Sequence, residues 1–315
     1  MSGHEQCRSV RTPFTVVRAD CAVGTSAVEL PLDPAEPVFR GHYRGFPIFA
    51  GVFLVETAHL AALGRPPADA PALRLARLES ARFLHPAYPG DTLTFTLRWA
   101  RDGAGWVCRA TAATERDRVA RIRLRYEDAG TAAALAGPPE FSAAPAELPA
   151  GLGPLSLPEL MARIPHRDEM LLIDRVRTFV PGAHVTAEKA VTYGEPWYRH
   201  LGDEAKDPAA YAYPVGPLME SFNQAAAVLA TAGRANTDVL AEEVLMLGSY
   251  TDLAFGAPVF PGDTLEHRVR LARTVDGIQI FEGTTRVRGE LVLTVGQAVL
   301  ARRPAGHLRQ APPIH

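Results

Sequence analysis

The feature that most constrains this chain is an internal duplication. Residues 36–60 read EPVFRGHYRGFPIFAGVFLVETAHL, and residues 195–224 repeat this stretch as EPWYRH, a polar insert and then PVGPLMESFNQ. A second landmark, YPGDTL at 88–93, recurs as FPGDTL at 260–265. Because the landmarks keep their order and nearly keep their spacing, the sequence predicts two copies of one domain fused head to tail.

Length, charge and cysteine content exclude several classes of protein. The 315 residues suffice for two domains of ordinary size, and a formal net charge of −2 argues against a general nucleic-acid or anionic-membrane binder. No run of about 18 apolar residues is present, and the N-terminal stretch has no apolar core of a signal peptide. Cys7, Cys21 and Cys108 are too scattered for a disulfide framework or a zinc site. We therefore expect a cytoplasmic protein.

Each half combines one apolar helix with several strands. The run GVFLVETAHLAAL at 51–63 predicts a helix that is buried on nearly all sides and ends at Gly64. Strand-like runs precede it at 14–31 and follow it from 73 to 127. A single buried helix followed by antiparallel strands predicts an α+β domain in which a sheet wraps around the helix.

The boundary between the halves is a stretch rich in Ala, Pro and Gly. Residues 128–154 have no hydrophobic period, so we interpret them as an exposed linker. The predicted domains are then 1–127 and 155–305, followed by a tail at 306–315. We expect two antiparallel sheets, each wrapped around a central buried helix.

The motifs resemble those of the hot-dog-fold β-hydroxyacyl-carrier-protein dehydratases of fatty-acid synthesis. The order E-P-x-F-x-G-H-Y, P-x-x-x-G-V-x-x-x-E and P-G-D-x-L carries the resemblance, and IPHRDEMLLIDRV at 164–176 is the most similar part. Both halves match, roughly over 14–126 and 155–303, so the chain resembles a double hot-dog such as the dehydratase domain of a polyketide synthase. The resemblance implies a hydro-lyase that acts on a 3-hydroxyacyl chain carried by acyl carrier protein.

The resemblance also assigns roles to residues of the first copy. In the family, each active site combines a His from one hot-dog with a Glu or Asp from the central helix of the other. His42 matches the catalytic His, and Gly51 matches the glycine whose backbone N–H binds the thioester carbonyl. Ile48 occupies the position whose carbonyl holds the His ring.

Two glutamates fall at the acid position of the family, Glu56 in the first copy and Glu220 in the second. The family has Gln four residues after its acid, on the same helix face. The second copy keeps this residue as Gln224, whereas the first copy has Leu60. The complete acid pair is therefore expected in the second copy.

The second copy departs from the family around its own histidine, His200. It lacks the preceding Gly, has Val215 in place of the carbonyl-binding Gly, and carries the insert Asp203–Tyr213, which could be a lid or a plug. We therefore predict one competent site, His42 with Glu220, and a degenerate one, His200 with Glu56.

The chemistry of dehydration explains why these residue types are expected. A neutral His suits removal of the α-proton, and the Gly51 N–H at a helix N-terminus suits an enolate-like oxygen. We expect burial to raise the pKa of Glu220, so that it keeps a proton for the departing hydroxyl. The apolar walls of the pocket are expected from Phe49, Phe53 and Phe222.

The remaining motifs point to no other site. His59 and His166 are interpreted as structural, and no phosphate loop or metal-ligand cluster predicts a cofactor or a metal. No serine lies in a G-x-S-x-G context. Another hot-dog activity (thioesterase, enoyl hydratase or isomerase) or a non-catalytic acyl-binding or scaffold subunit remains an alternative. Chain length, pathway and homodimer formation by the fused chain stay open.

Overall fold

The computed structural model describes residues 7–20, 24–103, 105–131, 135, 154–201, 207–233 and 243–308. Most of the predicted linker at 128–154 and of the predicted tail at 306–315 lies outside these residues, as does Cys21. Of the insert at 203–213, only residues 207–213 are described.

The two halves share a succession of two strands, a central helix and four strands. The N-terminal half contains β1 (Thr15–Asp20), β2 (Thr25–Pro31), α1 (Pro37–Gly41), α2 (Gly51–Leu63), β3 (Leu73–Phe83), β4 (Thr92–Asp102), β5 (Gly105–Ala113) and β6 (Arg118–Asp128). The C-terminal half contains α3 (Leu157–Met161), η1 (Asp168–Met170), β7 (Arg175–Val180), β8 (His184–Ala190), η2 (Pro196–Tyr198), η3 (Pro208–Tyr211), α4 (Val215–Ala230), β9 (Glu243–Phe255), β10 (Thr264–Val275), β11 (Ile278–Val287), β12 (Glu290–Pro304) and α5 (Ala305–Leu308).

The strands form one 12-stranded sheet in the order β1-β2-β4-β5-β6-β3-β9-β12-β11-β10-β8-β7. The two expected sheets are therefore joined edge to edge, through antiparallel pairing of β3 with β9. Leu78 faces Leu253 and Ala81 faces Tyr250 across this junction. Pairing satisfies backbone groups that two separate sheets would leave exposed at their edges. The register also relates the halves by an approximate two-fold axis through the junction.

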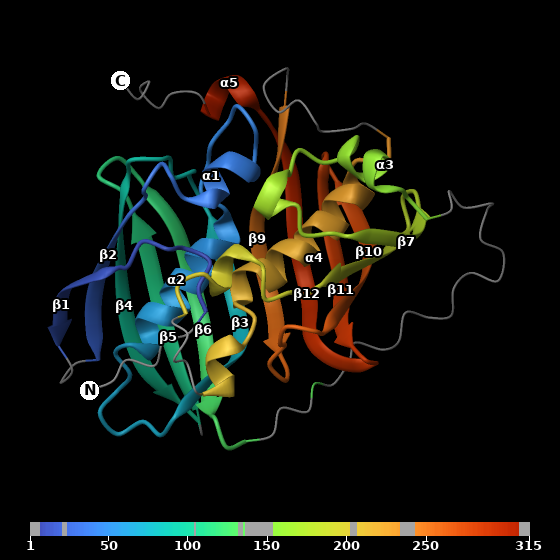
Figure 1. Cartoon of the computed structure of the whole chain (residues 1–315). Coiled ribbons are helices and arrows are strands. Elements are labelled where there is room, and N and C mark those ends of the chain that lie inside the picture. Colours follow the sequence, from blue (N-terminus) through green and yellow to red (C-terminus); the bar gives the residue numbers. More distant parts are fainter. Residues whose placement is uncertain are drawn as a thin grey trace.

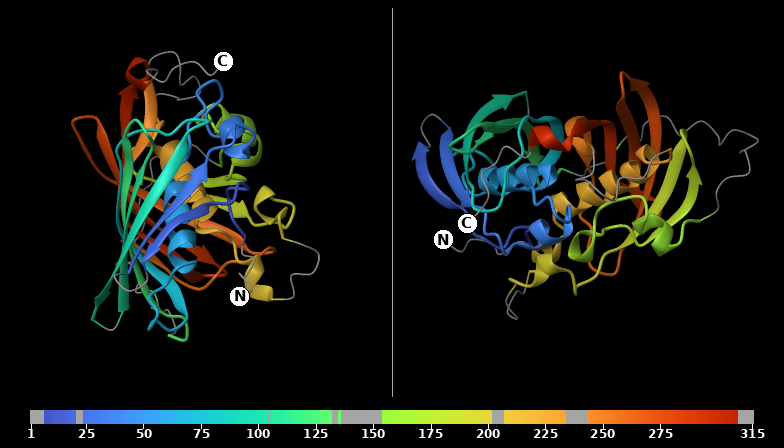
Figure 2. Two further views of the ribbon diagram at one scale, coloured as in Figure 1. Left: turned by 90° about the vertical axis from the view of Figure 1, so that its left-hand side faces the viewer. Right: turned by 90° about the horizontal axis from the view of Figure 1, so that it is seen from above.

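Helices α2 and α4 lie on the same side of the curved sheet, one in each half (Figures 1 and 2). Both are almost entirely buried, and they contact each other near the junction between the halves. Their side chains join those of the strands in one core that extends through both halves. This is the arrangement expected of a double hot-dog, and it brings the start of each helix close to the middle of the other.

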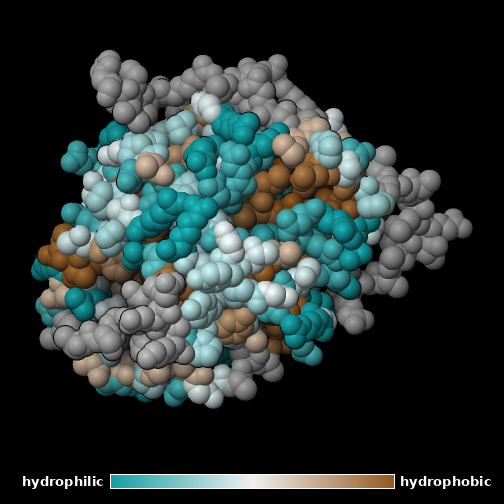
Figure 3. Space-filling model, viewed as in Figure 1, coloured by the Kyte–Doolittle hydropathy of each residue, from teal (hydrophilic) through white to brown (hydrophobic). Residues whose placement is uncertain are grey.

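The surface above the helices is mixed in character. On the face shown in Figure 3, hydrophobic residues form separate patches among hydrophilic ones. None of the described helices combines the length and the hydrophobicity that a bilayer crossing requires.

Candidate active site

His42 is placed by a close approach between two segments that are far apart in the sequence. It follows α1 directly, and the Gly41 carbonyl accepts a hydrogen bond from the backbone N–H of Arg167 at 2.8 Å. A Cβ at position 41 would lie 2.4 Å from the Arg167 carbonyl oxygen, so the contact requires glycine. The missing glycine before His200 thus removes the condition for this approach in the second copy.

The orientation of His42 follows from its hydrogen bond. Its Nδ1 lies 3.1 Å from the Ile48 carbonyl oxygen, and its ring stacks on Tyr43 at 4.2 Å between centroids. A carbonyl only accepts hydrogen bonds, so Nδ1 carries the hydrogen and Nε2 has the free lone pair. Burial lowers the pKa of His42 to about 4, helped by the charge of His166 and opposed by that of Glu220. The imidazole is therefore neutral at pH 7.

Glu220 projects from the second turn of α4 and is 4% exposed. Gln224, one turn further along, donates from Nε2 to Glu220 Oε1 at 3.2 Å and to the Met170 carbonyl at 2.7 Å. Its Oε1 accepts from the backbone N–H of Leu172 at 2.8 Å. Gln224 thus fixes Glu220 and ties α4 to the segment that contains η1. Leu60, its counterpart in α2, has no amide for either task.

His166, which the sequence analysis interpreted as structural, lines the same pocket and contacts Glu220. Its Nε2 lies 3.1 Å from Glu220 Oε1, its ring is 5.3 Å from that of His42, and it is buried. Its position in IPHRDEMLLIDRV, the segment with the strongest family resemblance, could have pointed to His166 from the sequence. Adjacent Arg167 supports the loop by donating to the carbonyls of Met161, Ile164 and His166.

The protonation of Glu220 differs from the expectation of a simple raised pKa. Burial is the largest cause and acts to raise the pKa of Glu220, but the hydrogen bond and charge of His166, together with His42 and Gln224, outweigh it, so the pKa is lowered. A desolvated carboxyl alone was the wrong picture because the sequence analysis did not place a histidine beside it. The relevant unit is the hydrogen-bonded pair of His166 and Glu220.

The ligand atoms of His42, His166 and Glu220 all lie within 4.8 Å of one another, and in the described part of the chain they form the only cluster of three that could hold a metal ion. Two of them already share a hydrogen bond, and Nδ1 of His42 faces a carbonyl. These contacts occupy one nitrogen of each imidazole and one oxygen of the carboxyl group within the protein.

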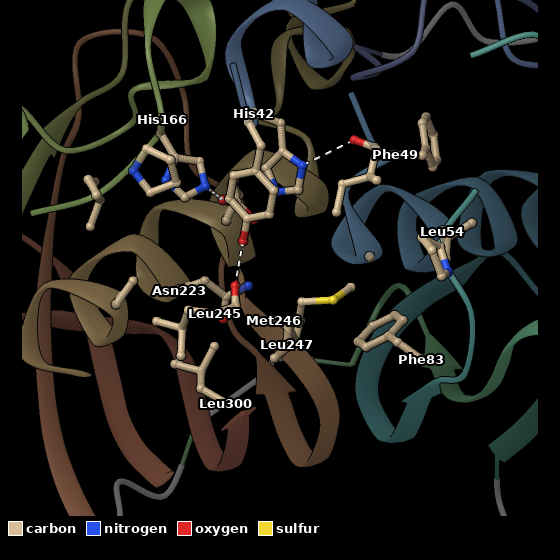
Figure 4. A pocket seen from close by; sticks show the side chains of 18 of the residues that line it. His42, Phe49, Leu54, Phe83, His166, Asn223, Leu245, Met246, Leu247 and Leu300 are labelled. Atoms are coloured by element: carbon tan, nitrogen blue, oxygen red, sulfur yellow. Dashed lines mark hydrogen bonds and ion pairs between the residues drawn. The ribbon is translucent and has the colours of Figure 1, made fainter. Parts of the chain in front are cut away.

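A pocket opens next to the three residues, lined from both halves of the chain (Figure 4). Gly51 lines it at the first position of α2, where helix N–H groups lack intrahelical partners. A Cβ there would lie 3.1 Å from the Phe83 ring, so glycine keeps this part of the pocket open. The other walls are mostly aliphatic or aromatic and include Leu54, Phe83, Leu245, Met246, Leu247 and Leu300.

Of the three expected phenylalanine walls, only Phe49 lines the pocket. Phe53 packs edge-on against Trp197, and Phe222 packs edge-on against His267. Both side chains are fully buried in the core because the helices are covered on all sides, and the expectation was wrong for these two.

Glu56 is buried at the corresponding position of α2, but its partners differ. Its carboxylate accepts from the backbone N–H and the hydroxyl of Ser9, both at 2.6 Å, and from the backbone N–H of Gly216 at 2.8 Å. A Cβ at position 216 would lie 2.4 Å from Glu56 Oε2, so no space is left between the carboxylate and α4.

The predicted partner of Glu56, His200, follows η2 and is partly exposed. It is not among the described residues that line the cavity beside Glu56. The described end of the insert lies at this cavity, where Ala209, Ala212 and Tyr213 line it and the Ala210 carbonyl accepts from the Cys7 N–H at 3.2 Å.

Comparison with known proteins fits this geometry. Residues 20–120 match a family model described as ApeI dehydratase, and residues 164–296 match one described as FabA-like domain. The 3-hydroxyacyl-[acyl-carrier-protein] dehydratase FabZ of Halorhodospira halophila is 37% identical over 140 residues, which are 44% of this chain and 87% of that protein. The chain belongs to this dehydratase family. FabZ of Thioalkalivibrio sulfidiphilus is 34% identical over 140 residues, 44% of this chain and 91% of that protein.

Solved structures of dehydratase domains share the fold of this chain over nearly its whole length. The dehydratase domain of PpsC from Mycobacterium tuberculosis, in complex with C12:1-CoA, aligns with a TM-score of 0.62 and 15% identity, covering 96% of this chain and 100% of that one. The dehydratase domain from the CurJ module of curacin polyketide synthase aligns with a TM-score of 0.63 and 12% identity, covering 94% and 97%. The double hot-dog architecture is therefore shared with these dehydratase domains.

Proposed function

We propose that this chain dehydrates a 3-hydroxyacyl thioester to the 2-enoyl thioester, with His42 as the base and Glu220 as the acid. The observation that carries the proposal is their proximity: one residue from each half meets the other in a single buried pocket, with ligand atoms within 4.8 Å. A distance above about 8 Å would have favoured a non-catalytic subunit, because one substrate could not then contact both groups.

His42 accepts the α-proton at Nε2. The Ile48 carbonyl holds the Nδ1–H, so the base is presented in a single tautomer. As the proton leaves, negative charge develops on the thioester oxygen. The backbone N–H of Gly51, at the positive end of α2, stabilises that charge.

Glu220 delivers a proton to the departing hydroxyl. The proton reaches the hydroxyl through the 3.1 Å contact between His166 Nε2 and Glu220 Oε1. Breaking the bond between C3 and oxygen then releases water, and the electrons of the Cα–H bond form the C2=C3 double bond. Return of the proton from His42 to the pair restores the enzyme.

The physiological substrate is proposed to be carried by acyl carrier protein. The FabZ relatives are named 3-hydroxyacyl-[acyl-carrier-protein] dehydratases, which supports a carrier-bound substrate. The aliphatic lining of the pocket suits the acyl chain.

A mass-spectrometric assay on one 3-hydroxyacyl thioester tests the proposal. Loss of water with the acyl group retained is expected for dehydration, whereas a thioesterase would release the acyl group. His42→Ala should lower kcat by about 10²–10⁴-fold. The matched control, His200→Ala, should stay within about twofold. An equal loss in both variants would indicate two working sites, and a wild-type enzyme that releases only free acid would reject dehydration.

A further inference from the structure

A second cavity lies on the other side of the molecule's approximate two-fold axis. Its volume is about 530 Å³, which falls in the range of small-molecule sites. It is lined mainly by aliphatic side chains, including Leu60, Leu63, Leu75, Val215, Leu218 and Val292.

The second cavity is the internal counterpart of the catalytic pocket. Corresponding positions of the two copies line the two spaces, with Glu56 matching Glu220, Leu218 matching Leu54 and Phe255 matching Phe83. Each helix contributes to both, because the start of α2 borders the catalytic pocket and its middle borders the second cavity, whereas α4 does the reverse. The second cavity has therefore inherited the walls of an acyl-binding pocket.

The polar groups of the second cavity already form hydrogen bonds within the protein. Glu56 receives three hydrogen bonds from Ser9 and Gly216, so its oxygens are occupied within the protein. His59, at the position that Asn223 occupies in the catalytic pocket, has Nδ1 3.1 Å from the Tyr126 hydroxyl. The cavity thus retains apolar walls without an opposed base and acid.

We propose that the second cavity binds the acyl chain of a thioester and does not convert it to a product. The ligand class rests on the proposed function, since the cavity is the duplicate of the pocket assigned to the substrate's acyl chain. The guanidinium of Arg74 is committed to Glu127 at 2.6 Å, so the lining offers no free cation for a carboxylate in the described residues. An uncharged thioester head is therefore the better match than a free fatty acid.

Calorimetric titration with dodecanoyl-N-acetylcysteamine tests the proposal. This saturated thioester has no 3-hydroxyl group and cannot be dehydrated, so it reports binding alone. Wild-type protein is expected to bind two molecules per chain. Leu63→Trp, which fills the second cavity from a partly exposed position of α2, should reduce the number to one and keep dehydration within about twofold of wild type.

The matched variant Ala227→Trp fills the catalytic pocket at the position equivalent to Leu63. It should also leave one binding site, but abolish dehydration. Val215→Trp repeats the block of the second cavity from α4, in case Leu63→Trp does not fold. Unchanged stoichiometry in a folded Leu63→Trp or Val215→Trp protein would overturn the proposal.

The binding result is independent of the proposed reaction. If wild-type protein bound two thioesters but released no water from a 3-hydroxyacyl substrate, the function would be rejected and the second site would stand. A photoreactive diazirine analogue of the same thioester, with the labelled residues identified by fragment-ion sequencing, should label residues within 56–63 or 215–218. Labelling confined to residues that line the catalytic pocket would contradict a second site.

Discussion

Glu220 and Glu56 occupy the same position of two homologous buried helices, yet their surroundings differ. Glu220 contacts two ionisable or polar side chains, His166 and Gln224, and lies at a pocket. Glu56 is held by two backbone N–H groups and one hydroxyl. The comparison teaches that carboxyls buried at the same position of two hot-dog helices can have different partners, because the segment that packs opposite decides which groups they contact.

The largest effect that separates the two glutamates is expected from Glu220→Gln. The amide keeps the shape of the side chain but cannot donate a carboxylic proton, so kcat should fall by about 10²–10⁴-fold. Steady-state kinetics on a 3-hydroxyacyl thioester measure the loss. Residual activity above a tenth of wild type would break the comparison, because Glu220 would then not be the acid.

Replacing His166, which contacts Glu220, is a second test of the difference between Glu220 and Glu56. His166→Asn should lower kcat by about 10- to 100-fold, since a hydrogen bond to a charged group is worth about 1.5–3 kcal/mol. Because the contact that relays the proton is broken while the apolar walls of the pocket stay, KM should remain within about twofold of wild type. His59→Asn, a partly buried histidine beside Glu56, is the control and should change neither kcat nor KM. A fall in kcat that is matched by a loss of folded protein would indicate a merely structural His166.

The acid limb of the pH profile tests the state of His42. Its pKa is lowered to about 4, and the proton occupies Nε2 below that pH, so kcat/KM should fall about tenfold per pH unit below about pH 4. The charge of Glu220 raises the pKa of His42, so in Glu220→Gln the residual activity should persist to lower pH, whereas Glu56→Gln should not shift the limb.

Circular dichroism at each pH must accompany this measurement. Desolvation lowers the pKa values of His42, His59 and His267, so the unfolded chain takes up protons first as the pH falls below about 6.5. Stability therefore decreases over the same range. An acid limb near pH 6.5 in protein that remains folded would contradict a buried, neutral His42.

The smallest catalytic effect and a clear structural one are expected from Glu56→Gln. An amide nitrogen would face the N–H groups of Ser9 or Gly216, and an unsatisfied buried group costs about 1–3 kcal/mol. We expect a lower midpoint of urea unfolding and a kcat within about twofold of wild type. A large loss of kcat without loss of stability would mean that Glu56 takes part in catalysis.

The repeated motifs were sufficient to predict the α+β class, the two copies of a helix wrapped by antiparallel strands, and the hot-dog family. These features depend on local periodicity and on turns such as Pro-Gly-Asp, which a sequence displays directly. The joining of the strands through β3 and β9 was not visible, because edge pairing between two domains leaves no periodic signal.

The candidate site, like the fold, was predictable from the sequence only in part. The sequence alone determined that one histidine and one glutamate, His42 and Glu220, keep the family spacing in opposite halves. Only the tertiary structure placed His166 against Glu220 and Ser9 against Glu56, because these contacts join segments more than 45 residues apart. Proton affinity in a buried site depends on such neighbours, and their identity is decided by how the chain folds back on itself.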